Sequence, residues 1–182
     1  EGAPKFNHPD EIRHLYESGW EIDRNILRRI LALPRETMLD DLAAMLEDAK
    51  ERYAQFAKRR KAPEDFLNLS HTGFPLHALF LLQEIDSPRA FDLVMSFIST
   101  EIPGRCTNRK FTDFWLGTHI TETLDNIIAR CGRGREEELA AFAVASNASM
   151  YIRVAATTAL KRIAQNYPER TRGVQQLFDT IF

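Results

Sequence analysis

The chain has little cysteine, no long apolar run and no large excess of either charge. Only two cysteines, Cys106 and Cys131, occur in 182 residues. Two thiols exclude a disulfide framework and a four-cysteine metal site, and they favour a reduced, cytoplasmic location. The longest apolar runs, such as Ala78–Leu82, are far too short to span a bilayer. The formal net charge of −2 argues against a nucleic-acid binder, which usually concentrates positive charge.

A strand pattern is also missing, because apolar and polar residues do not alternate with period two over any useful length. Apolar residues recur instead at spacings of three and four, which is the helical pattern. The sequence therefore predicts an all-α fold with essentially no sheet. We expect residues 1–21 to form a partly irregular N-terminal lead-in and residues 22–182 to form a single domain. Helices are predicted at about 22–33, 35–61, 72–86, 88–100, 112–131, 135–147, 150–166 and 170–181.

One motif closes three of these helical patterns and is followed each time by a polar break and a second helical pattern. The motif is Leu82-x-x-Ile85, then Leu124-x-x-Ile127, then Leu160-x-x-Ile163. The intervals are 124 − 82 = 42 and 160 − 124 = 36 residues. A period near forty in an all-helical pattern is typical of stacked helix pairs of the HEAT or armadillo type. We therefore expect the three leucines to lie in the core.

Three segments carry a resemblance to known repeats. Residues 147–160, with the core Ile-Arg-Val-Ala-Ala-Thr-Thr-Ala-Leu, look like the central part of a HEAT-like repeat. His77–Leu82 and Asp113–Glu122 together resemble a family of bacterial HEAT-like proteins of unknown function, and the likeness covers residues 22–182. It implies an α-solenoid of stacked antiparallel helix pairs and brings no known activity. Family members typically have Gly-Asp where this chain has Gly117-Thr118.

The best candidate site lies on the predicted helix 112–131. Trp115, His119, Glu122 and Asn126 follow one another at spacings of four, three and four, so they would form one stripe. A tryptophan beside a histidine and a carboxylate could anchor a partner peptide. The alternative is structural, with the tryptophan packed between repeats and the histidine bonded within its own helix.

A metal site is the basis of a second hypothesis. His77, His119 and Glu122 could bind a metal if the first two helix pairs stack with these faces together, which would make the chain a metal-dependent enzyme. HEAT-type di-iron enzymes repeat an adjacent His-Glu dipeptide, and this chain has none. We therefore predict no catalytic residue, metal or cofactor.

Basic clusters are the basis of a third hypothesis, nucleic-acid binding. Arg105, Arg109 and Lys110 form the most plausible anion-binding cluster, and residues 58–61 form a basic run at a predicted helix end. The alternatives are a solvated loop and a helix end whose cations complement the helix dipole.

The second helix of each pair usually lines the concave side of a solenoid. The exposed residues expected there are Arg89, Asp92, Ser96, Glu137, Glu138, Arg172, Gln175, Gln176 and Asp179. Their mixed charges make no basic track for nucleic acid and suit a protein partner or a peptide better. We therefore predict a non-enzymatic interaction module, with self-association as a further expectation because the chain ends on the apolar pattern of helix 170–181.

Overall fold

The computed structural model describes residues 4–19, 21–58, 73–101, 108–145 and 148–181. These residues form eleven α-helices and no strand, which confirms the all-α prediction for this part of the chain. None of the described helices combines the length and the hydropathy that a membrane crossing requires. The helices are α1 (Pro9–Glu17), α2 (Arg24–Leu31), α3 (Arg35–Lys58), α4 (Phe74–Leu82), α5 (Pro88–Ile98), α6 (Asn108–Leu116), α7 (His119–Glu122), α8 (Leu124–Cys131), α9 (Glu136–Val144), α10 (Met150–Asn166) and α11 (Thr171–Ile181).

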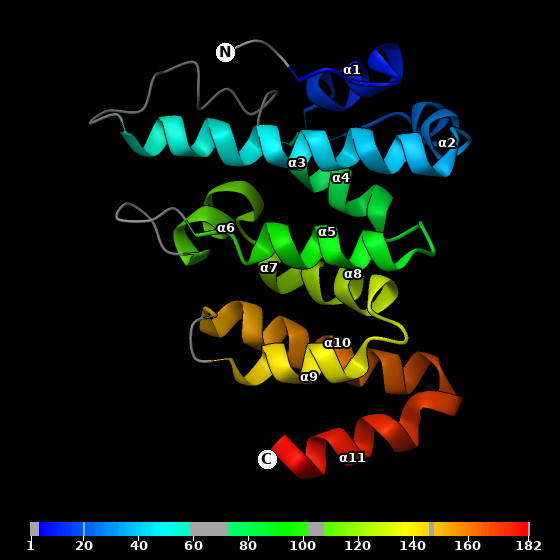
Figure 1. Ribbon diagram of the computed structural model, residues 1–182, viewed down its shortest axis with the longest axis vertical. Helices are drawn as coiled ribbons and strands as arrows, with labels where there is room; N and C mark the ends of the chain where they lie inside the picture. The colour runs from blue at the N-terminus through cyan, green and yellow to red at the C-terminus, as the bar shows by residue number, and fades with distance from the viewer. Residues whose placement is uncertain (1–3, 20, 59–72, 102–107, 146–147, 182) are drawn as a thin grey trace.

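The helices follow one another along the long axis of the molecule (Figure 1). α1 and α2 lie at one end and α11 at the other, with α3, α5 and α9 in one row and α4, α8 and α10 in a second row. Contacts run through the stack from α3 to α4, from α4 to α5, from α5 to α8, from α8 to α10, from α10 to α9 and from α9 to α11. Each of these helices therefore contacts its neighbours along the stack.

The leucines of the repeated motif lie in the core between these layers. Leu82, Leu124 and Leu160 are each at most 1% exposed. The isoleucine three residues after each of them is also buried. The prediction that these three leucines face inward is confirmed.

The helix predicted over 112–131 needs a correction, because the structure divides it into α6, α7 and α8. The break begins at Gly117, whose φ of +51° lies in the left-handed region that favours glycine. Thr121 and Thr123 then donate their hydroxyls to the carbonyls of Thr118 and His119 at 3.0 and 3.1 Å, bonds that compete with a regular helix. Side chains on either side of Gly117 consequently do not share one helical face.

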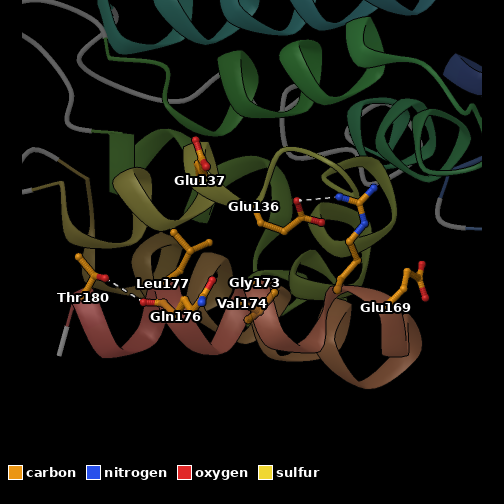
Figure 2. Close-up of a pocket in the computed structure, with 9 residues that line it drawn as sticks. Glu136, Glu137, Glu169, Gly173, Val174, Gln176, Leu177 and Thr180 are labelled. Atoms are coloured by element: carbon orange, nitrogen blue, oxygen red, sulfur yellow. Dashed lines mark hydrogen bonds and ion pairs between the residues drawn. The ribbon is translucent and has the colours of Figure 1, made fainter.

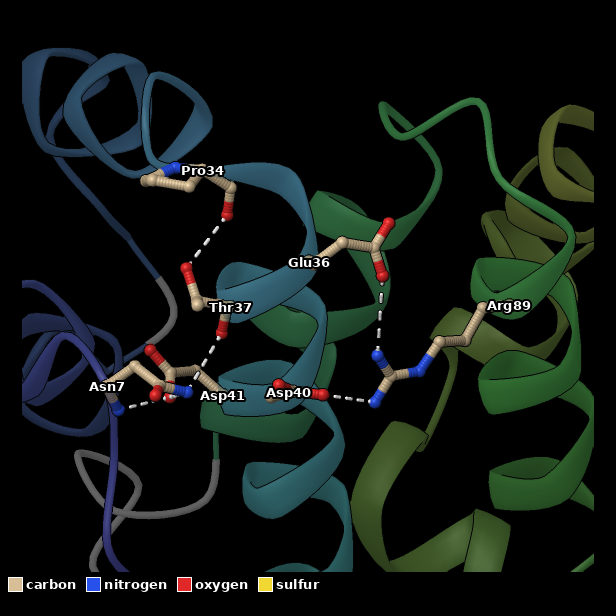
Figure 3. Close-up of polar contacts among 7 residues, drawn as sticks. All are labelled: Asn7, Pro34, Glu36, Thr37, Asp40, Asp41 and Arg89. Carbon is tan, nitrogen blue, oxygen red and sulfur yellow. Dashed lines mark hydrogen bonds and ion pairs between the residues drawn. The ribbon is translucent and has the colours of Figure 1, made fainter.

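The N-terminal lead-in predicted over 1–21 also needs a correction, because α1 is part of the packed fold. Ile12 and Leu15 are fully buried, and α1 contacts α2 and α4. The backbone N–H groups of Asn7 and His8 donate to the Asp41 carboxylate of α3 at 2.6 and 2.9 Å, and the contact to Asn7 is drawn in Figure 3. This carboxylate fixes the start of α1 against α3.

Other helix ends differ from the expected ranges by a few residues. α4 ends at Leu82 rather than 86, and α9 ends at Val144 rather than 147. Residues 59–61, 72 and 146–147 of the expected helices lie outside the described residues.

Arginines near the start of α5, α9 and α11 connect successive helices of the stack. Arg89 contacts Asp40 at 2.5 Å and Glu36 at 3.8 Å on the first turns of α3 (Figure 3). Arg135 contacts Asp92 of α5 at 2.9 Å, and Arg170 lies 3.7 Å from Glu136 of α9. The Arg170–Glu136 pair stands at the edge of a groove between α9 and α11.

Candidate functional site

A groove of about 380 Å³ lies between α9 and α11 (Figure 2). Two helices and the 3₁₀ turn Pro168–Arg170, which connects α10 to α11, form its walls. The residues that line it are Glu136, Glu137, Glu169, Arg170, Gly173, Val174, Gln176, Leu177 and Thr180.

The floor of the groove is aliphatic. Val174 is 2% exposed, and the half-buried Leu177 packs against the core. Figure 2 shows Leu177 rising from α11 toward α9. Gly173 belongs to the same wall, and a Cβ atom placed on it would meet no atom within 4 Å. The small residue therefore leaves open space where a longer side chain would project.

The rim of the groove carries more negative than positive charge. Glu136 is the most enclosed of its three carboxylates, since its side chain is 12% exposed. It accepts from the Gly134 N–H at 2.9 Å and pairs with the Arg170 guanidinium. The carboxylates of Glu137 and Glu169 make no hydrogen bond or ion pair with the described residues. Two carboxylates thus remain available at the rim.

Local sequence explains why Glu137 remains available. Three consecutive glutamates occupy the first turn of α9, where the helix dipole favours negative charge. Glu136 turns to Arg170, and Glu138 pairs with Arg135, which lowers the pKa of Glu138 by hydrogen bonding. The middle glutamate has neither partner and lies on the groove.

Trp115, the first residue of the predicted stripe, is a core side chain in the structure. It is 1% exposed, and its ring packs edge-on against Phe74 at 5.4 Å and Phe114 at 4.9 Å between ring centroids. The expectation of one continuous stripe is wrong, because the bend at Gly117 separates this residue from those that follow. The structural alternative describes Trp115.

The other members of the stripe lie on α7 and α8. His119 Nδ1 lies 4.0 Å from a carboxylate oxygen of Glu122. Asn126 donates its side-chain amide to Gln83 at 3.4 Å, which links α8 to the end of α4. A role in partner binding stays a prediction for these three residues.

His77, proposed as a metal ligand in the second hypothesis, is buried at 4% exposure. Its Nε2 lies 2.7 Å from the Gly19 carbonyl oxygen, so that nitrogen donates to the carbonyl. Burial lowers its pKa and favours the neutral imidazole. Among the residues described, no group of three or more His, Cys, Asp or Glu side chains is placed to hold a metal ion.

The predicted anion-binding cluster falls mostly outside the described residues. Arg105 is not described, and of Arg109 only the backbone is described, as part of α6. Lys110 is exposed on α6. Of the two cysteines only Cys131 is described, and burial raises its pKa to about 12, so it is not an activated nucleophile.

Most residues expected on the concave side are exposed, namely Asp92, Ser96, Glu137, Glu138, Arg172, Gln175, Gln176 and Asp179. Of these, the structure brings Glu137 and Gln176 to the groove. The sequence interpretation missed Glu169, Gly173 and Thr180. Pro168 marked the break before α11, but no spacing indicated that α11 folds back beside α9.

The outward side of α11 is polar in the described residues, with Arg172, Gln175 and Asp179 exposed and Val174 turned inward. Self-association through the C-terminal end therefore stays a prediction.

Comparison with known proteins gives one match. Residues 22–179 match the family described as a protein of unknown function, DUF1186. No curated protein and no solved structure matches the chain. Since the match covers most of its length, the chain belongs to the DUF1186 family of proteins of unknown function.

Proposed function

We propose that this chain is a non-enzymatic interaction module, an α-solenoid of the HEAT type, that binds a polypeptide segment in the groove between α9 and α11. The observation that carries the proposal is a groove whose floor holds Val174 and the half-buried Leu177, beside a polar rim with unpaired carboxylates. Apolar contact with a few placed polar groups is the usual composition of a binding site.

The solenoid part of the proposal is supported by the buried Leu-x-x-Ile motif and by the order of helix contacts along the stack. Repeats that contact only their neighbours form extended surfaces, and such surfaces commonly bind other polypeptides. The location that we propose is the cytoplasm, as expected from the low cysteine content.

The size of the groove is sufficient for part of a peptide segment. About 380 Å³ lies within the range of about 300–1,000 Å³ that is usual for ligand pockets. A volume of this kind accepts a few side chains of a partner. Glu137 and Glu169 would repel phosphate groups, so the groove does not support the nucleic-acid hypothesis. The metal hypothesis has no donor set among the described residues.

The proposal can be tested by selecting peptides from a random display library on the wild-type chain. The selected peptides are then measured against Gly173→Leu, which fills the groove from its own wall. We expect the affinity to fall by about tenfold or more, equivalent to about 1.4 kcal/mol.

The matched control is Gln175→Leu, which adds a leucine to the same helix at an exposed position outside the groove. It should retain binding, and thermal melts should show both variants folded. Failure to select any peptide, or equal binding to both variants, would overturn the proposed function.

A further inference from the structure

We infer that the segment bound between α9 and α11 is cationic and inserts an aliphatic side chain, as a peptide combining lysine or arginine with leucine, isoleucine or valine would do. The inference rests on the proposed function and adds the chemistry of the partner. It starts from the two available carboxylates and the floor between α9 and α11.

Of the three carboxylates that line the groove, one is paired with an arginine and two are unpaired in the described part of the chain. Arg170 is the only cation among the lining residues, and it lies beside Glu136. In Figure 2 Glu136 lies between Glu137 and Glu169. A bound segment therefore meets one negative group on α9 and another on the 3₁₀ turn, while the arginine is already engaged.

The floor determines the apolar part of the ligand. Val174 and Leu177 are the aliphatic side chains that line the groove beside the open position at Gly173, Leu177 being the more exposed of the two, and none of the described lining residues carries an aromatic ring. Without a ring there is no face for stacking or for a cation–π contact. A branched aliphatic side chain fits this surface, while cationic groups beside it reach the rim carboxylates.

Carboxylates at an exposed rim also determine which partners are rejected. An acidic segment would bring like charges together and would have only Arg170 to contact, at the expense of its pair with Glu136. A neutral segment would keep the aliphatic contact and lose both charge pairs.

The experiment measures fluorescence anisotropy with the full chain and four short labelled peptides of equal length. Three alternate leucine with lysine, glutamine or glutamate, and the fourth alternates lysine with serine. We expect the Leu/Lys peptide to bind most tightly, the Leu/Gln peptide more weakly, and the Leu/Glu and Lys/Ser peptides weakest.

Each outcome of the anisotropy experiment supports or overturns one part of the inference. If the Leu/Gln or Leu/Glu peptide binds as tightly as Leu/Lys, the cationic inference is wrong and peptide binding in the groove still stands. If the Lys/Ser peptide binds as tightly, the aliphatic part is wrong. If none of the peptides binds, the inference fails, and the library selection on the wild-type chain, with its comparison to Gly173→Leu, then decides the proposed function.

Matched variants separate the groove from the general charge of the protein. The double variant Glu137→Gln/Glu169→Gln should weaken Leu/Lys binding by about twofold to thirtyfold, the range for two exposed charge pairs, and reduce its salt dependence. Glu51→Gln/Glu101→Gln removes the same charge from exposed acids outside the groove and should leave binding unchanged. An equal loss in both double variants would assign the attraction to net charge and overturn the inference.

Discussion

Where α1, α3 and α4 meet, aromatic rings and polar side chains pack against one another, whereas small side chains between α9 and α11 leave a groove. Tyr16 of α1 stacks on Phe74 of α4 with ring centroids 4.4 Å apart. Its hydroxyl donates to Asp48 of α3 at 2.9 Å, and the Arg52 guanidinium lies 5.5 Å from both rings. One cluster thus joins three helices.

The α9–α11 end has none of these large groups at its groove. Gly173, Val174 and Thr180 occupy the α11 side, and charged groups occupy the rim. Packed helix axes usually remain about 8–10 Å apart, so the side chains decide whether the space between them is filled. Stacked helices can therefore meet in a closed joint, as α1, α3 and α4 do, or leave an open groove, as α9 and α11 do.

The largest expected effect is that of removing the Phe74 ring, which packs between α1 and α4. Phe74→Ala should lower the free energy of unfolding by about 3–5 kcal/mol, because it removes a fully buried ring and leaves a cavity. Leu177→Ala at the groove should cost only about 1 kcal/mol, because this leucine is half-buried. Urea denaturation measures both, and equal costs would contradict the difference between the two ends.

Asp41→Asn tests the polar part of the closed joint. Asp41 is 1% exposed and accepts from the backbone N–H groups of Asn7 and His8. An asparagine would remove the charge and turn an amide toward one of these donors, so we expect a loss of about 1–3 kcal/mol. Asp40→Asn is the matched control on the preceding residue, which is exposed and pairs with Arg89. If thermal melts show the same loss of stability for both substitutions, the burial of Asp41 does not add to its contribution to stability.

The buried His77 makes the stability of the closed joint depend on pH. Its pKa is lowered in the folded chain, chiefly by burial, so the unfolded chain takes up a proton first as the pH falls. The unfolded state then binds more protons, and stability decreases as the pH drops below about 6.5, the ordinary histidine pKa.

Denaturation at several pH values checks this expectation, with His77→Gln as the comparison. The variant should lose the part of the acid destabilisation that His77 causes. Parallel pH profiles of the two proteins would disprove the assignment.

The smallest expected effect is that of Gly173→Ala at the groove between α9 and α11. This substitution should stabilise the fold and weaken peptide binding. Gly173→Ala should raise the free energy of unfolding by about 0.5–1 kcal/mol, because alanine favours a helix interior and meets no atom within 4 Å. The added methyl group should also narrow the groove and weaken binding of the Leu/Lys peptide. If the variant is more stable and binds the Leu/Lys peptide as tightly as the wild type, Gly173 is not part of the binding surface.

Much of the candidate site was beyond the reach of sequence reasoning. Trp115 and His119 stand four residues apart, so an unbroken helix would place them on one side. Gly117 breaks that helix through a positive φ, and an isolated glycine does not reveal its φ from the sequence. Glu137 and Gln176 were expected to be exposed, but the sequence did not indicate that they would face a common groove.

The sequence by itself determined that the described chain is helical and that Leu82, Leu124 and Leu160 turn inward, because the periodicity of apolar residues is a local property of the helix. Tertiary structure decided which joints close and which stay open. That outcome depends on the side chains that meet across two helices distant in the sequence, such as Tyr16 with Phe74, or Glu136 with Arg170.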